Sequence, residues 1–156
     1  MSETPAERRP DRVTGSSSWE DEYGFARAVA AGDFVLVSGS TAVGADGVVQ
    51  HEGDPYGQTL AAFGTARAAL ERFGLTLADV VRTRTYVTHV RDCDEVVRAH
   101  KSLFDQVRPA ATMVVVAGLA DPRALVEVEL DAHRAGLAGT RAGLAGTSEA
   151  LEGNQP

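Results

Sequence analysis

The sequence contains a single cysteine, Cys93, among its 156 residues. One thiol excludes an internal disulfide and any metal site built from several cysteines, and it is typical of a protein kept in a reducing compartment. Asp92 and Asp94 flank this cysteine. Two neighbouring carboxylates would raise the pKa of the thiol, which disfavours a role as catalytic nucleophile.

Long apolar runs are also absent from the sequence. No stretch approaches the roughly 18 apolar residues of a membrane-spanning helix. The first residues, "MSETPAERRPDRVTGSSSWEDE", lack the apolar centre of a signal peptide. We therefore expect a cytoplasmic protein that does not work in a membrane.

Positive charge is scarce as well, because 15 Lys and Arg face 22 Asp and Glu, for a net charge of -7. An acidic surface disfavours nucleic acid or an anionic membrane as the partner and leaves a small molecule as the expected ligand. Neither paired metal-ligand spacing among the histidines nor a glycine-rich phosphate loop is found, so we predict no metal and no cofactor. The histidines are His51, His89, His100 and His133.

The composition divides the chain into three parts. Residues 1–22 are polar, charged and rich in Ser and Pro, which predicts a flexible N-terminal tail. Residues 135–156 repeat "AGLAGT" at 135–140 and 142–147. Repeated glycines weaken a helix, so a second flexible tail is predicted there. Residues 23–134 remain as one folded domain.

Residue periodicity within this domain predicts an α+β fold. Apolar spacing indicates a helix over 55–73, and capping aspartates begin a second helix over 92–107. Strands are predicted within 25–41, at a hairpin around Asp46-Gly47, and within 79–90 and 108–134. The element order β-β-β-α-β-α-β-β favours a mixed sheet with two helices on one face. The bare sheet face favours oligomerisation.

The last predicted strand, "ALVEVELDAH" at 124–133, combines apolar and acidic residues. Val126, Val128 and Leu130 fall on one side of it, and Leu125, Glu127, Glu129 and Asp131 fall on the other. The acidic side is either exposed to water or partly desolvated at a subunit interface. Desolvation would raise a carboxyl pKa and suit the group to deprotonate a water. The spacing leaves both interpretations open.

Three short motifs occur in a familiar order: "VSG" at 37–39, "RPA" at 108–110 and "LVEVE" at 125–129. With them, residues 23–134 resemble the RidA (YjgF/YER057c/UK114) family. The resemblance implies a chorismate-mutase-like fold and a homotrimer whose sheets pack into a barrel, with a cleft between each pair of subunits. It also implies hydrolysis of reactive enamine or imine intermediates to 2-keto acids and ammonia.

The resemblance also implies individual site residues. Glu127 matches the carboxylate that positions a water, Phe25 matches an aromatic residue over the substrate, and Gly39 matches the point where backbone groups approach the ligand. The arginine that grips a substrate carboxylate is replaced by Ala111, and a frequent cysteine by Met113. The chain is therefore most similar to an arginine-lacking branch of the family. Charged hydrogen bonds are worth about 1.5–3 kcal/mol each, so losing this grip changes the expected substrate.

Arg98 aligns with a cleft position on the second helix and is the first candidate to replace the missing arginine, with Arg27 and Arg108 as weaker ones. Otherwise the cleft prefers a neutral, more apolar ligand. The leading hypothesis is a hydrolase or deaminase of imines, enamines or related metabolites in which Glu127 holds the attacking water. The alternatives are a non-catalytic ligand-binding or regulatory trimer and a divergent biosynthetic tailoring enzyme.

Overall fold

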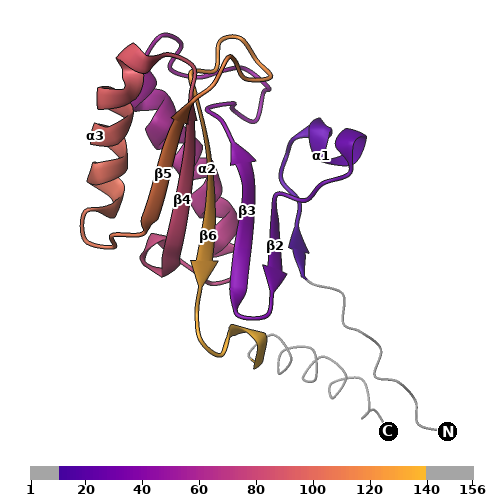
Figure 1. Cartoon of the computed structure of the whole chain (residues 1–156). Helices are drawn as coiled ribbons and strands as arrows, with labels where there is room; N and C mark the ends of the chain where they lie inside the picture. The colour runs from indigo at the N-terminus through magenta and orange to yellow at the C-terminus, as the bar shows by residue number, and fades with distance from the viewer. Residues whose placement is uncertain (1–10, 140–156) are drawn as a thin grey trace, which may run out of the picture.

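A computed structural model describes residues 11–139 of the chain. These residues form a mixed sheet with the strand order β1-β2-β3-β6-β4-β5. Figure 1 shows the sheet together with its helices. The strands are β1 (Arg12–Val13), β2 (Ala28–Ala31), β3 (Phe34–Ser40), β4 (Val80–Val87), β5 (Ala110–Val115) and β6 (Val126–His133). The helices are α1 (Ser18–Tyr23), α2 (Pro55–Glu71) and α3 (Cys93–Phe104), with short 3-10 turns at Leu77–Asp79 and Val90–Asp92.

Strand β6 lies in the middle of the sheet although it is the last strand in the sequence (Figure 1). It pairs antiparallel with β3 on one side and with β4 on the other. Strands β4 and β5 pair in parallel, and α3 forms the crossover that a parallel pair requires. Because β4 lies between β6 and β5, the acidic strand β6 and strand β5 do not pair with each other within one chain.

The predicted helices are both present, and they cover the same face of the sheet. Helix α2 begins after Asp54, whose carboxylate accepts a hydrogen bond from the amide of Gly57 at 3.0 Å. The chain after it turns at Gly74, with φ of 72°. The alternation in β6 buries its apolar side under these helices, and the α+β expectation is confirmed. Core residues include Phe63, Leu70, Phe104, Val126, Val128 and Leu130.

Two local expectations differ from the structure. The hairpin predicted at Asp46-Gly47 is reduced to an isolated bridge between Val43 and Val49. Of the flexible tail predicted over 1–22, the described residues 11–22 instead contain β1 and most of α1. Strand β1 adds to β2, and Glu20 of α1 is buried at 4% exposure. Strand pairing, the single buried valine Val13 and an ion pair of Glu20 hold this segment. None of these produces an apolar periodicity that could have revealed it.

The C-terminal expectation falls mainly on residues outside the described part of the chain. Of the stretch 135–156, the structure describes 135–139, where Leu137 is buried at 6% exposure. The second "AGLAGT" copy lies beyond these residues.

The face of the sheet opposite the helices is open in the single chain. Phe34 and Leu36 of β3 are 46% and 44% exposed, and β5 is exposed along its whole length. Leu36 pairs with Asp131 across the β3–β6 ladder, so apolar and acidic residues share this face. A surface of this kind is typical of a subunit interface.

Candidate functional site

The acidic side of β6 is largely paired with cations on the neighbouring strand. Arg84 of β4 lies with Nη1 3.4 Å from Oε1 of Glu129 and 3.6 Å from Oδ2 of Asp131. The hydroxyl of Tyr86 donates a hydrogen bond to Oε1 of Glu129 at 2.8 Å. That bond to the carboxylate, with burial, raises the pKa of Tyr86. Glu129 and Asp131 are therefore parts of a cross-strand ladder.

Glu127 is different from these two carboxylates. It is half-buried, and within residues 11–139 no side chain donates a hydrogen bond to it. Burial raises the pKa of Glu127, the charge of Glu129 raises it further, and Arg27 partly offsets the rise. A carboxylate with a raised pKa and free oxygens is suited to accept a proton from a bound water.

Gly39 provides the space that the Glu127 side chain occupies. A Cβ atom at Gly39 would overlap the carboxylate of Glu127. Gly39 lies where the β3–β6 register shifts between Val37 and Ser40, and such an irregularity redirects the strand next to a site. The family resemblance implies that backbone groups approach a ligand at this glycine, and this stays a prediction. In the structure it makes room for the glutamate.

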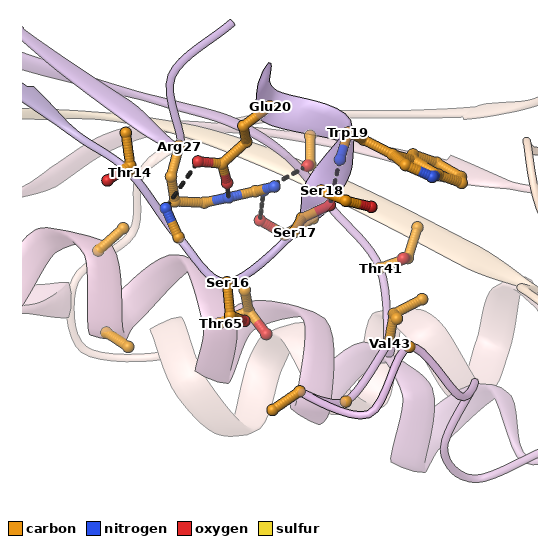
Figure 2. Close-up of a pocket in the computed structure, with 18 of the residues that line it drawn as sticks. Thr14, Ser16, Ser17, Ser18, Trp19, Glu20, Arg27, Thr41, Val43 and Thr65 are labelled. Carbon is orange, nitrogen blue, oxygen red and sulfur yellow. Dashed lines mark hydrogen bonds and ion pairs between the residues drawn. The ribbon is translucent and has the colours of Figure 1, made fainter. Parts of the chain in front are cut away.

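A cavity of about 850 Å³ opens beside Glu127 and Gly39. Its walls come from the 13–20 segment, the end of β3, the 41–50 loop and one side of α2. Figure 2 shows that many of the side chains around it carry hydroxyl groups. They include Thr14, Ser16, Ser17, Ser18, Thr41 and Thr65. This lining offers hydrogen bonds to a polar ligand without adding charge.

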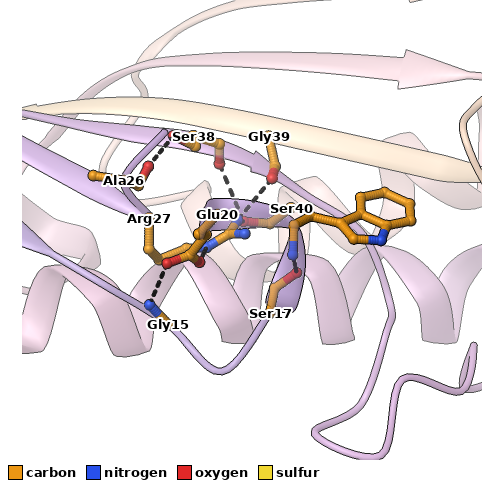
Figure 3. A network of polar contacts seen from close by, with 9 residues as sticks. Gly15, Ser17, Glu20, Ala26, Arg27, Ser38, Gly39 and Ser40 are labelled. Atoms are coloured by element: carbon orange, nitrogen blue, oxygen red, sulfur yellow. Dashed lines mark hydrogen bonds and ion pairs between the residues drawn. The ribbon is translucent and has the colours of Figure 1, made fainter. Parts of the chain in front are cut away.

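Arg27 lies in the wall of the cavity at the centre of a polar network (Figure 3). Its Nε donates to Oε1 of Glu20 at 3.1 Å, and its Nη1 donates to the carbonyl of Gly39 at 2.7 Å and to Oγ of Ser40 at 3.1 Å. The other oxygen of Glu20 accepts from the amide of Gly15 at 2.6 Å. The network ties α1 and the 13–17 segment to β3. The role of Glu20 could not be predicted from the sequence, where the local signal is limited to Ser17 as a helix cap before α1.

The predicted site residues fall into two groups. Glu127, Gly39 and Phe25 line the same cavity, and the guanidinium of Arg27 lies 5.9 Å from the Phe25 ring centroid. The others do not line this cavity. Ala111 and Met113 lie on β5, with β4 between them and β6.

Arg98 is engaged elsewhere on the surface of α3. Its Nη2 lies 2.5 Å from Oε2 of Glu95, and its guanidinium carbon lies 3.9 Å from the centroid of the Tyr56 ring. Of the three candidate arginines, Arg27 lines the cavity together with Glu127, and Arg98 and Arg108 do not.

Among the histidines, His100 has a structural environment. His100 contacts Oγ1 of Thr83 at 2.9 Å and packs against Phe63 and Phe104, and burial lowers its pKa. Across residues 11–139 no group of three potential ligands among His, Cys, Asp and Glu is placed to hold a metal ion. In the same residues, no helix has both the length and the apolar character needed to cross a membrane.

Comparisons with known proteins agree on one family. The model of the family described as endoribonuclease L-PSP matches residues 17–134. The uncharacterised protein SCO2049 of Streptomyces coelicolor is 54% identical over 126 residues, which cover 81% of this chain and 93% of that protein.

Solved structures extend the same likeness. The crystal structure of Rv2704 from Mycobacterium tuberculosis, described as a member of the YjgF/YER057c/UK114 family, is 39% identical with a TM-score of 0.72. That match covers 80% of this chain and 99% of Rv2704. The YjgF gene product of E. coli shares the fold at 23% identity and a TM-score of 0.70, covering 80% of this chain and 98% of its own.

Proposed function

Because this chain belongs to the endoribonuclease L-PSP (YjgF/YER057c/UK114) family, we propose that it hydrolyses reactive imine or enamine metabolites, with Glu127 holding the attacking water. Membership supports an imine-deaminase-like or small-molecule-binding role in general. The observation that carries the specific proposal is the half-buried Glu127 carboxylate, which has a raised pKa and opens on a cavity of about 850 Å³.

The reaction needs few groups, since an imine carbon is already electrophilic. The Glu127 carboxylate accepts a proton as water attacks the imine carbon, and the electron pair of the C–N double bond moves to nitrogen. The protonated glutamate returns this proton to nitrogen, which gives the carbinolamine. The carboxylate then takes the proton of the carbinolamine hydroxyl and passes it to the nitrogen, so that ammonia leaves as the C–N bond breaks and the carbonyl forms. General base assistance of this type contributes about 10²–10⁴-fold in rate.

We further propose that the working unit is a homotrimer packed through its open sheet faces. The support is the exposure of apolar residues on that side of the sheet and along β5, where Val114 and Val115 are 43% and 49% exposed. In such an assembly, β5 of a neighbouring subunit brings Ala111 and Met113 to the Glu127 cavity. The site would then lie between subunits, as the family resemblance implies.

The expected setting is a cytoplasm and the expected ligand is a small metabolite. One cysteine in 156 residues fits a reducing compartment. The net charge of -7 opposes binding to an RNA backbone, despite the ribonuclease in the family description.

The test compares ammonia release from freshly generated imines by the wild type and by Glu127→Gln. Glu71→Gln is the matched control, because Glu71 is an exposed carboxylate on α2 that pairs with Arg67. We expect a loss of about 10²–10⁴-fold in Glu127→Gln and no change in the control. Full turnover by Glu127→Gln on a substrate that the wild type uses would refute the proposal.

A second candidate function is a non-catalytic ligand-binding or regulatory trimer, which the alanine at position 111 favours because the family's carboxylate grip is missing. It predicts tight metabolite binding without turnover. Any measurable kcat that depends on Glu127 decides against it.

A further inference from the structure

Arg27, the cation in the cavity wall, already has its charge compensated by a carboxylate of the same chain. The side chain of Arg27 is 13% exposed and its guanidinium pairs with the carboxylate of Glu20, whose side chain is 3% exposed. Its remaining hydrogen bonds go to Gly39 and Ser40. A substrate carboxylate that took Arg27 for itself would leave the buried Glu20 carboxylate without its cation and with the Gly15 amide as its remaining donor, which is strongly unfavourable. Arg27 therefore does not replace the missing anion grip.

The other charges around the cavity leave it negative. Asp121 pairs with Arg123 at 2.8 Å, so its charge is compensated. The charged lining residues that then remain are Asp46, Arg72 and Glu127. Asp46 and Arg72 are both exposed and of opposite charge, so the half-buried Glu127 is the charge of this chain that dominates the cavity. A second carboxylate entering beside Glu127 meets like charge.

From this geometry we propose that the Glu127 cavity takes a cationic, carboxylate-free ligand, namely a protonated imine or amine. The inference rests on the proposed function for its reaction, and it names the charge class of the substrate. Trp19 also lines the cavity and is 46% exposed, and an indole face attracts an organic cation. The hydroxyl groups around the cavity bind the uncharged polar parts of the same ligand.

The reaction balances for such a substrate. An iminium ion, with carbon doubly bonded to NH₂⁺, and one water give a carbonyl compound and an ammonium ion, so one positive charge enters and one leaves. The C–O bond forms in the first step, when water adds to the iminium carbon, and the C–N bond breaks in the second, when ammonia leaves. The departing ammonia takes the last proton from Glu127, which therefore ends each turnover as a carboxylate. No oxidant or reductant is consumed.

The experiment uses two imines that differ by one carboxylate. A flavin-dependent amine oxidase generates the imine of benzylamine, and an amino-acid oxidase generates the imine of phenylglycine. An adjacent charge changes an ionic equilibrium by about one to three powers of ten. We therefore expect the kcat/KM of the wild type to be at least about tenfold higher for the benzylamine imine than for the phenylglycine imine.

The charge assignment is tested with two variants of α1. Glu20→Gln leaves the charge of Arg27 uncompensated, and the preference for the carboxylate-free imine should fall toward one. Glu22→Gln is the matched control, because Glu22 is an exposed carboxylate on the same helix, and the preference should stay at the wild-type value. A preference that is unchanged in Glu20→Gln would overturn the assignment.

Binding is measured separately, so that the ligand class is tested without turnover. Calorimetry with benzylammonium, phenylglycine and the neutral benzyl alcohol should show binding of the first alone, reduced at least about tenfold in Glu127→Gln. If the phenylglycine imine is hydrolysed as well as the other, the charge proposal is wrong and imine hydrolysis stands. If neither imine is hydrolysed, the proposed function fails. Calorimetry then still decides, since absent or equal binding of the three probes overturns the cationic ligand.

Discussion

Replacing Arg27 by glutamine would leave the carboxylate of Glu20, which is 3% exposed, without its cation. Removing one partner of a buried ion pair costs about 3–5 kcal/mol, because the remaining charge stays out of water. The Gly39 carbonyl and the Ser40 hydroxyl lose a donor in the same variant. We expect Arg27→Gln to lower the free energy of unfolding by about 3–5 kcal/mol. In a domain of this size, Tm should fall by roughly 10–20 °C.

The assay is urea unfolding followed by far-ultraviolet circular dichroism at one protein concentration, with Glu20→Gln and the double variant completing a cycle. The coupling energy between Arg27 and Glu20 should reach about 1–3 kcal/mol. Arg67→Gln is the control, because it breaks a pair with Glu71 at 3.6 Å in which the side chains are 56% and 60% exposed. Its cost should be about 0.3–0.5 kcal/mol. If Arg27→Gln costs no more than Arg67→Gln, or if the cycle is additive, the reasoning is refuted.

Three other outcomes are expected. Gly39→Ala should displace the Glu127 carboxylate and lower kcat for imine hydrolysis about 10²-fold or more. In the control Gly64→Ala the added methyl group meets no atom within 4 Å, so this variant should keep its activity and stabilise α2 by about 0.5–1 kcal/mol. Equal activities of the two variants would contradict the spacing role of Gly39. The pKa of Glu127 is raised and its charged form is the base. As the pH decreases, kcat/KM should therefore fall at a pH above the ordinary pKa of a glutamate. A fall that begins only at the ordinary glutamate pKa would argue against Glu127 as the base. Leu36→Arg on the open sheet face should convert a sedimenting trimer to monomer at micromolar concentration, and a wild-type monomer there would overturn the assembly.

The parts of the fold that follow a regular period could be predicted from the sequence. The alternation from Val126 to His133 identifies β6 and its buried face, and the aspartate cap with a following proline identifies the start of α2. Helix α1 could not be predicted, because Glu20 is held by an ion pair to Arg27 seven residues away. Such a pair leaves no repeating pattern, and the acidic serine-rich segment around it has the composition of a tail.

The candidate site was predictable in part for a related reason. Glu127 could be identified as one of three acidic residues on a strand, but the spacing alone does not distinguish it from Glu129. The distinction comes from Tyr86 and Arg84 on β4, which contact Glu129 although they lie more than forty residues before it in the sequence. The strand order also separates Ala111 from this site within one chain, and non-consecutive strand pairing leaves no local signal.

The central place of β6 has a consequence for how the chain acquires its structure. Strands β3 and β4 have no partner in common until β6 enters between them. During synthesis, the edges of β3 and β4 that pair with β6 therefore stay unpaired until the residues up to His133 have left the ribosome. Closing the sheet also requires contacts between distant parts of the sequence, which slows folding. We expect nascent chains that stop before β6 to depend on chaperones, and the finished sheet to form in one late step.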